Sequence, residues 1–220
     1  NMFLSRIELD TKRRSTMKAL TSPNILHGAI EQSYSGPRER RLWRLDQLQH
    51  HLYLLLLSPN KPDLTNIVNQ FGFPDRNPRW ETRSYGLLLD SVKDATRWRF
   101  RLVANPIKCC KPSQDDKNRG QIHAHITSAH QSEWLLQRCQ NYGFSLNPDQ
   151  FLVVGSQWYR FHKGNQRKSP VTILAVTYEG ILTITNAVRF QQTLQEGLGR
   201  GKAFGMGMLT IIRDKGAENE

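Results

Sequence analysis

The sequence predicts an α+β protein that consists of two ferredoxin-like (RRM-like) βαββαβ domains in tandem. Segments in which apolar and polar residues alternate, as in half-buried strands, are interspersed with segments of helical periodicity. Their order is strand–helix–strand–strand–helix–strand, as in the split βαβ unit, and the same order begins again near residue 97. The 220 residues are enough for two domains of about 100 residues each.

The N-terminal domain is predicted to span residues 2–92. Its first strand is Phe3–Leu9, where apolar residues alternate with polar ones. A helix is predicted to begin at Ser22-Pro23, because serine suits the N-cap and proline the first turn, and to stop before Gly36-Pro37. Two strands, a helix and a strand are predicted to follow at Leu42–Leu45, Leu52–Leu57, Leu64–Phe71 and Tyr85–Leu89.

The C-terminal domain is predicted to span residues 97–213. It begins with the alternating strand Trp98–Ala104, and residues 110–122 are polar enough to predict a mobile loop. Glu179-Gly180 is predicted to form a tight turn between two strands. The other predicted elements are a helix at Ser128–Tyr142 stopped by Gly143, strands at Phe151–Phe161, Val171–Tyr178 and Ile181–Ile184, a helix at Ala187–Glu196 and a last strand at Met208–Ile212.

The composition indicates a protein that binds nucleic acid. Lysine and arginine number 31 against 19 acidic residues, which gives a formal net charge of +12 and an isoelectric point near 10.0. Such a balance favours a polyanionic partner. No apolar run approaches the roughly 18 residues that a transmembrane helix requires, and so no membrane association is expected.

The cysteines argue against a disulfide framework, because their number is odd and Cys109 and Cys110 are adjacent. A reducing environment, and therefore a cytoplasmic location, is the simpler interpretation. Three histidines, His123, His125 and His130, follow these cysteines, but the spacing matches no common structural zinc site. Neither a metal nor another cofactor is expected.

A glycine-rich loop spans residues 197–207 and contains five glycines. Glycine adopts positive φ readily and lets the backbone approach a ligand closely. Successive free N–H groups in such a turn can cradle a phosphate, and Arg200 and Lys202 add positive charge. The loop is therefore a predicted phosphate contact.

Two further segments combine basic and aromatic residues. In Arg97–Arg101 the alternation places three arginines on one face of a strand and two aromatics on the other, with few acids nearby in the sequence. Gln157–Lys168 is predicted to form a basic hairpin, which can enter a groove or follow a nucleic-acid backbone. The alternative for each is a solvated face without a ligand. RNA contacts are predicted for Arg99, Arg101, Arg160, Lys163, Arg167 and Lys168.

His27 is predicted to stand in the first turn of the helix that begins at Ser22-Pro23. The positive end of a helix favours a nearby phosphate and disfavours a protonated imidazole, which suits proton transfer near neutral pH. The alternative is a histidine that is packed or solvated without a chemical role. The sequence contains no P-loop, no GxSxG and no metal-binding carboxylate cluster. If the protein is a nuclease, we therefore expect it to work without metal on RNA, where the substrate's own 2′-OH attacks the phosphate.

Several segments together resemble the CasE family, the CRISPR RNA-processing endoribonucleases of type I-E Cascade. The specific segments are Arg101–Lys108, with the pattern Arg-x-x-Ala-Asn-Pro-x-Lys, and the glycine-rich loop. Met2–Arg6, Glu133–Leu135 and Tyr178–Leu182 support the resemblance. The order and spacing of these segments agree over residues 2–213.

The resemblance implies tandem ferredoxin-like domains, cleavage of the CRISPR repeat RNA at the base of its hairpin, and retention of the product within Cascade beside the backbone subunits. It implies that His27 is the catalytic histidine. Lys108, in the first specific segment, and Arg200 and Lys202, in the loop, are also expected to contact RNA. Asn24 departs from the family, whose members often have tyrosine at this position, because asparagine cannot serve as an acid or a base.

The sequence therefore predicts a metal-independent endoribonuclease that leaves a 2′,3′-cyclic phosphate and a 5′-hydroxyl. His27 is expected to move a proton either from the nucleophile or to the leaving 5′-oxygen. One alternative, which Asn24 supports, is a non-catalytic subunit of the same assembly that holds the RNA hairpin without cutting it. A ribosome- or tRNA-associated structural protein fits the charge but not the resemblance in the glycine-rich loop.

Overall fold

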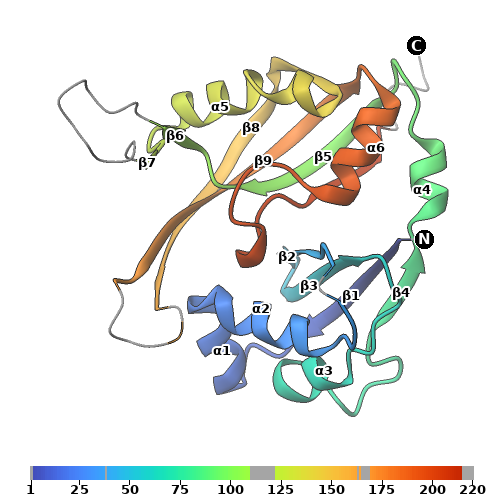
Figure 1. Ribbon diagram of the computed structural model, residues 1–220, viewed down its shortest axis with the longest axis vertical. Helices are drawn as coiled ribbons and strands as arrows, with labels where there is room; N and C mark the ends of the chain where they lie inside the picture. Colours follow the sequence, from blue (N-terminus) through green and yellow to red (C-terminus); the bar gives the residue numbers. More distant parts are fainter. Residues whose placement is uncertain (1, 38, 110–121, 163, 165–168, 215–220) are drawn as a thin grey trace.

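The structure, a computed structural model, describes residues 2–37, 39–109, 122–162, 164 and 169–214 (Figure 1). Nearly all of the loop predicted at residues 110–122 therefore lies outside the described residues, and Ile122 already belongs to a strand. Lys163, Arg167 and Lys168 of the predicted basic hairpin also lie outside them. The described chain forms two lobes, each built on one four-stranded sheet.

The N-terminal lobe contains an antiparallel sheet with the strand order β2-β3-β1-β4. Its helices include one that the sequence did not predict, α1, which directly precedes α2. The elements are β1 (Phe3–Leu9), α1 (Arg14–Thr21), α2 (Pro23–Gln32), β2 (Leu42–Leu48), β3 (His51–Ser58), α3 (Thr65–Phe71), β4 (Glu81–Ser84) and α4 (Gly86–Ser91).

The C-terminal lobe contains a second antiparallel sheet with the order β10-β5-β9-β8. In both sheets the last strand pairs with the first, the first with the third and the third with the second, which confirms the ferredoxin-like fold class. The elements are β5 (Arg97–Ala104), β6 (Ile107–Cys109), β7 (Ile122–Ala124), α5 (Ser128–Leu136), η1 (Cys139–Tyr142), β8 (Phe144–Phe161), β9 (Val171–Ile184), α6 (Ala187–Glu196), η2 (Lys202–Phe204) and β10 (Leu209–Arg213). The assignment of residues 2–92 and 97–213 to separate domains stays a prediction.

One predicted element is wrong near the end of the N-terminal lobe, and one strand there was missed. Residues 85–89 were expected to form a strand, but the strand β4 ends at Ser84 and α4 begins at Gly86. The strand was missed because Glu81–Ser84 is polar and half-exposed at the sheet edge, so it lacks apolar alternation. Three successive leucines at 87–89 have no period and suit a short helix equally well.

Gly180 does not form the predicted turn, because β9 runs unbroken through it. The glycine instead lies opposite Phe151, where the pairing of β8 with β9 shifts register between Leu146 and Phe151. A Cβ atom at Gly180 would lie only 2.2 Å from the carbonyl oxygen of Gln150. Glycine is therefore required here because two backbone segments approach closely at a bulge. In the sequence, a glycine at a bulge looks the same as a glycine in a turn.

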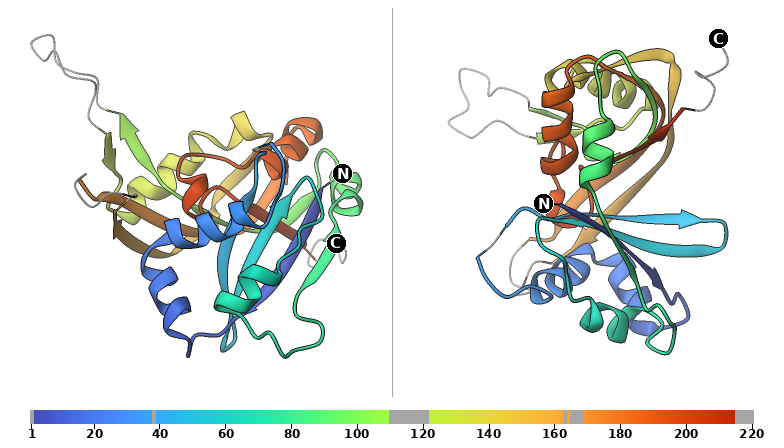
Figure 2. Two further views of the ribbon diagram at one scale, coloured as in Figure 1. Left: turned by 60° about the horizontal axis from the view of Figure 1, so that its bottom comes forward. Right: turned by 90° about the vertical axis from the view of Figure 1, so that its right-hand side faces the viewer.

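The apolar run in β3 is buried on both faces. Leu54 and Leu56 pack in a core with α1, α2 and α3, whereas Leu57 packs in the core of the C-terminal lobe. Figure 2 shows the N-terminal sheet between its own helices and the C-terminal lobe. Continuous apolar runs are typical of strands covered on both faces. The lobes therefore share a hydrophobic boundary and hold each other in a fixed arrangement.

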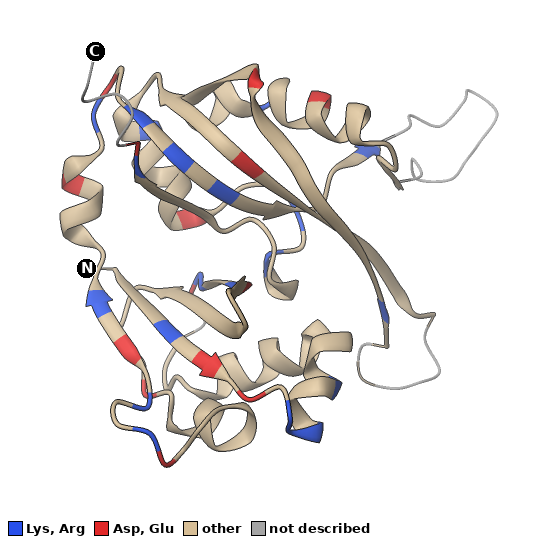
Figure 3. Cartoon of the chain, turned by 180° about the vertical axis from the view of Figure 1, so that it is seen from behind, with Lys and Arg blue, Asp and Glu red and all other residues tan. Residues whose placement is uncertain are grey.

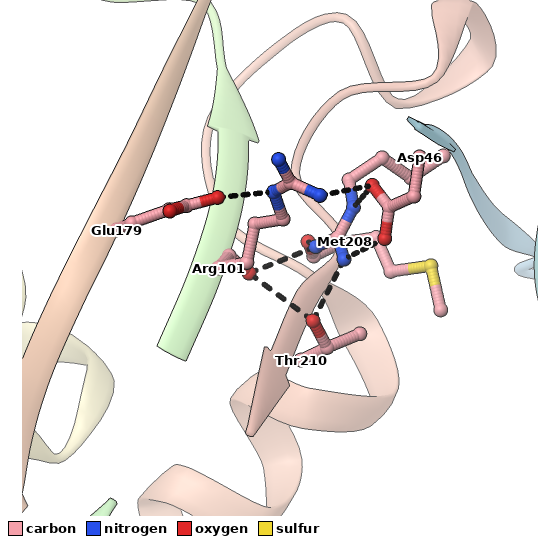
Figure 4. Close-up of polar contacts among 6 residues, drawn as sticks. Asp46, Arg101, Glu179, Met208 and Thr210 are labelled. Atoms are coloured by element: carbon pink, nitrogen blue, oxygen red, sulfur yellow. Dashed lines mark hydrogen bonds and ion pairs between the residues drawn. The ribbon is translucent and has the colours of Figure 1, made fainter. Parts of the chain in front are cut away.

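A buried charge cluster joins the lobes at β2 (Figure 4). The Arg44 and Asp46 side chains are 2% and 8% exposed, and the guanidinium donates to both carboxylate oxygens at 2.7 and 2.6 Å. It also donates to the carbonyl oxygens of Arg101 and Met208 at 2.8 and 3.0 Å and to the Thr210 hydroxyl at 2.8 Å. Arginine has five N–H donors, and here all five find acceptors.

Candidate active site

His27 lies on α2, which faces the boundary between the lobes. The helix begins with Pro23, and His27 is its fifth residue and half-buried. The sequence had placed the histidine in the first turn, whereas it stands just beyond it. Because the field of a helix terminus falls off within the first turn, the terminus acts on His27 less than expected.

The glycine-rich loop folds against α2 through η2. Gly205 has φ +80°, and a Cβ atom there would lie 2.7 Å from the indole ring of Trp43. The loop is closed by hydrogen bonds from the Leu198 N–H to the Gly207 carbonyl at 2.9 Å and from the Gly207 N–H to the Val103 carbonyl at 2.7 Å. The N–H groups of Leu198 and Gly207 are therefore occupied within the protein. Phosphate contact by the rest of the loop stays a prediction.

His27 and Lys202 line the same cavity of about 380 Å³, one from each lobe. Arg40 and Arg41 also line it, together with the acids Glu31 and Glu39. Arg41 is paired with Glu31 at 3.3 Å and stacks over the Tyr34 ring. Burial of Lys202, together with the positive charge of Arg40, lowers the pKa of its ammonium group. A half-buried imidazole beside these cations can bind an anion and transfer a proton.

The long strands β8 and β9 extend from the C-terminal lobe to α1 and α2 (Figure 1). At this contact the Asn24 side chain donates from Nδ2 to the His162 carbonyl at 3.4 Å, and its Oδ1 is buried without a partner. Arg160 is exposed near the end of β8, opposite Thr172. The hairpin therefore meets the helix of His27 close to the position where the sequence departs from the CasE family.

The arginines of β5 lie apart from the cavity of His27. The predicted alternation is observed, since Arg99 is exposed and Trp98 and Phe100 are buried. Although few acids lie nearby in the sequence, Arg101 is paired, because it lies 2.6 Å from Glu179 and 3.7 Å from Asp46. Figure 3 shows the basic residues along β5 and an acidic residue on the neighbouring strand. That acid, and Asp46 on β2, approach Arg101 only through tertiary pairing, so local sequence could not show them.

Lys108 and Arg200 line a second cavity on the C-terminal lobe, away from His27. Sequence reasoning did not identify Arg40 and Arg41 as site residues, although both belong to a visible basic run. Their position beside His27 depends on how β2 and the glycine-rich loop meet.

Within the described residues no three His, Cys, Asp or Glu side chains are grouped to hold a metal, and no helix there has the length and apolar character of a membrane span.

Comparisons with known proteins cover nearly the whole chain. The model of a family described as CRISPR associated protein matches residues 2–213. The CRISPR-associated endoribonuclease Cse3 of Thermus thermophilus is 28% identical over 229 residues, with 96% of this chain and 99% of the relative covered. A structure of Cse3 bound to a 19-nucleotide RNA superposes with a TM-score of 0.75, at 26% identity over 96% of this chain and 98% of that chain.

A chain of a CRISPR RNA-guided surveillance complex in a pre-nicking state also shares the fold. It gives a TM-score of 0.67 at 21% identity and covers 96% of this chain and 100% of its own length. This likeness concerns the fold.

Proposed function

Because the chain belongs to the family of CRISPR-associated proteins, we propose that it is an endoribonuclease that cleaves CRISPR precursor RNA at the base of the repeat hairpin. We further propose that it keeps the product bound as a subunit of Cascade, beside the backbone subunits, in the cytoplasm. The relative named as an endoribonuclease matches 96% of the chain. The observation that carries the proposal is the cavity in which His27 and Lys202 meet from different lobes.

The proposed reaction is an internal transesterification of RNA. The ribose 2′-oxygen forms a bond to the adjacent phosphorus, the bond from phosphorus to the 5′-oxygen breaks, and a proton passes in net terms from the first oxygen to the second. His27 carries out one of these proton transfers, as general base toward the 2′-OH or general acid toward the 5′-oxygen. The products are a 2′,3′-cyclic phosphate and a 5′-hydroxyl.

Cations around the cavity stabilise the additional negative charge of the transition state in this mechanism. Lys202 and Arg40 line it together with His27, and fixed positive groups are most effective where the charge develops. The lowered pKa of Lys202 also makes its ammonium group a stronger acid. These groups supply the positive charge that a metal ion provides in other nucleases, and on this basis we propose that the reaction is metal-independent.

A second function is favoured by Asn24, namely a subunit that binds the RNA hairpin without cutting it. The Asn24 amide donates a hydrogen bond to the His162 carbonyl in the protein's own β8–β9 hairpin. An amide has no group that transfers protons. The cavity lined by His27 favours the enzyme over this alternative.

The experiment is single-turnover cleavage of a repeat-hairpin RNA by the wild type, His27→Ala and His50→Ala. His50 is an exposed histidine in the turn between β2 and β3 and serves as the matched control. We expect His27→Ala to slow cleavage by about 10²–10⁴-fold with unchanged RNA affinity, and excess chelator to leave the wild-type rate unchanged. Cleavage by His27→Ala at the wild-type rate would contradict the assignment, as would restoration of a chelator-inhibited activity by magnesium or manganese. Binding without any cleavage by the wild type would support the second function.

A further inference from the structure

A second basic cavity, of about 550 Å³, lies on the other side of the glycine-rich loop. Its walls come from the segment after β5, from the turn before α5, from α5 itself and from the start of the loop. The lining side chains that the argument uses are Asn105, Lys108, His125, His130, Arg138 and Arg200. None of them lines the cavity of His27.

The charges of this cavity are not neutralised by the protein. Among the described residues, no acid lies within 4.0 Å of the charged groups of Lys108, Arg138 or Arg200. The single acid in the lining, Glu133, accepts a hydrogen bond from Gln137 at 2.8 Å. Three cations around one hollow repel one another, and a bound anion relieves that repulsion.

Two imidazoles stand beside these cations. The rings of His125 and His130 are 5.9 Å apart. Burial lowers the pKa of His125, and His130, Arg138 and Lys108 lower it further. His125 is therefore mostly neutral at physiological pH, and a neutral imidazole offers one donor and one acceptor.

Asn105 adds an unsatisfied polar group to the wall. The residue is only 8% exposed, and its side-chain oxygen has no hydrogen-bond partner. Buried polar atoms without partners are uncommon and costly. An amide and the neutral imidazole of His125 are suited to the hydrogen-bonding edge of a nucleobase, while the surrounding cations are suited to its phosphate.

The glycine-rich loop connects the two cavities. Arg200 lines the second cavity and Lys202 the cavity of His27, and two residues of chain span at most about 7 Å. An RNA strand that places a phosphate beside Lys202 therefore has its neighbouring nucleotide within reach of Arg200.

We propose that the second cavity is an RNA subsite that holds an unpaired nucleotide next to the scissile phosphate. The proposal rests on the proposed function, because it takes the cavity of His27 as the cleavage site. The phosphate of this nucleotide contacts Arg200 and Lys108, and its base contacts Asn105 and the imidazoles. The subsite would distinguish an RNA with single-stranded flanks from a bare stem.

The test measures the affinity of two RNAs that carry a 2′-deoxy sugar at the cleavage position, so that no cleavage is needed. One is the repeat hairpin with its unpaired flanks, and the other is the stem-loop alone. The proteins are the wild type, His125→Ala, Arg200→Met and the control Arg83→Met. Arg83 lies on β4, and its side chain is 85% exposed. Melting temperatures establish that each variant is folded.

We expect Arg200→Met to weaken binding of the flanked RNA by about tenfold, the size of one hydrogen bond to a charged group. His125→Ala should weaken it by about fivefold, the size of one hydrogen bond between neutral groups. Binding of the stem-loop alone should change less than twofold, and Arg83→Met should change neither. Equal losses for both RNAs, or no loss for either, would overturn the subsite. A wild-type protein that binds neither RNA would instead overturn the proposed function.

Discussion

Arg44 and Lys202 both lie where the two lobes meet, but their surroundings differ. Arg44 is buried, and all five of its donors bond to Asp46, two carbonyl oxygens and one hydroxyl. Lys202 lines a cavity, its pKa is lowered by burial, and among the described residues no acid forms an ion pair with it. Glu31 and Glu39 also line this cavity, but Glu31 pairs with Arg41 and Glu39 accepts from Asn60. A cation with every donor satisfied holds the fold together, whereas a cation that faces a cavity and forms no ion pair is available to a ligand.

The largest expected effect on stability comes from the buried cluster. Arg44→Met leaves Asp46 buried without its bidentate partner, and breaking such a pair costs about 3–5 kcal/mol. The urea midpoint should fall accordingly, with little change in the denaturant slope. The double variant Arg44→Met/Asp46→Leu removes both charges and should recover much of the loss. A single variant as stable as the wild type would show that the cluster does not hold the lobes.

A smaller effect is expected from two glycines, one in the glycine-rich loop and one in the helix of His27. Gly205→Ala places a Cβ atom 2.7 Å from the Trp43 ring at φ +80° and should cost about 1–3 kcal/mol. Gly28→Ala is the matched control, because Gly28 lies within α2 and a Cβ atom there meets nothing within 4 Å. It should stabilise the protein by about 0.5–1 kcal/mol. Thermal unfolding of both variants measures the contrast, and shifts of the same sign would contradict it.

The smallest expected effect concerns the protein's hairpin formed by β8 and β9. Arg160 is exposed near the end of β8. If it contacts one phosphate, Arg160→Ala should make the decline of log affinity with log salt shallower by about one unit. Arg83→Ala, on β4, should leave the slope unchanged. Salt titrations with the repeat hairpin measure both slopes. An unchanged slope for Arg160→Ala would assign this arginine to the solvated surface.

Local signals in the sequence predicted much of the fold. The helix Ala187–Glu196 was predicted with its observed bounds, and in the structure the Asn186 side chain caps its first turn and Gly197 ends it. The two ferredoxin-like orders followed from the succession of such elements. The helix α1 and the strand β4 were missed because neither segment has a clear periodic pattern of apolar residues. Their conformations depend on tertiary packing. Gly180 was misread because glycine serves both turns and bulges.

The site was predictable only in parts. His27 was identified from its position in a helix and from the resemblance to the family. Lys202 was identified separately, as part of the glycine-rich loop. Their shared cavity depends on packing between lobes that no local pattern encodes. Arg44 was not singled out, because its acceptors in the C-terminal lobe lie 57, 164 and 166 residues away along the chain. The ion pairs of Arg101 were missed for the same reason.

The most direct test of the account compares Lys202→Met with Arg44→Met in single-turnover cleavage and in thermal unfolding. A lysine whose pKa is lower in the folded state destabilises the fold at every pH at which it is protonated, and this cost disappears only in alkaline solution. Lys202→Met should therefore keep or raise the wild-type melting temperature at neutral pH and slow cleavage by about 10²-fold, whereas Arg44→Met should lower the melting temperature. A Lys202→Met protein that melts earlier but cleaves at the wild-type rate would contradict the account.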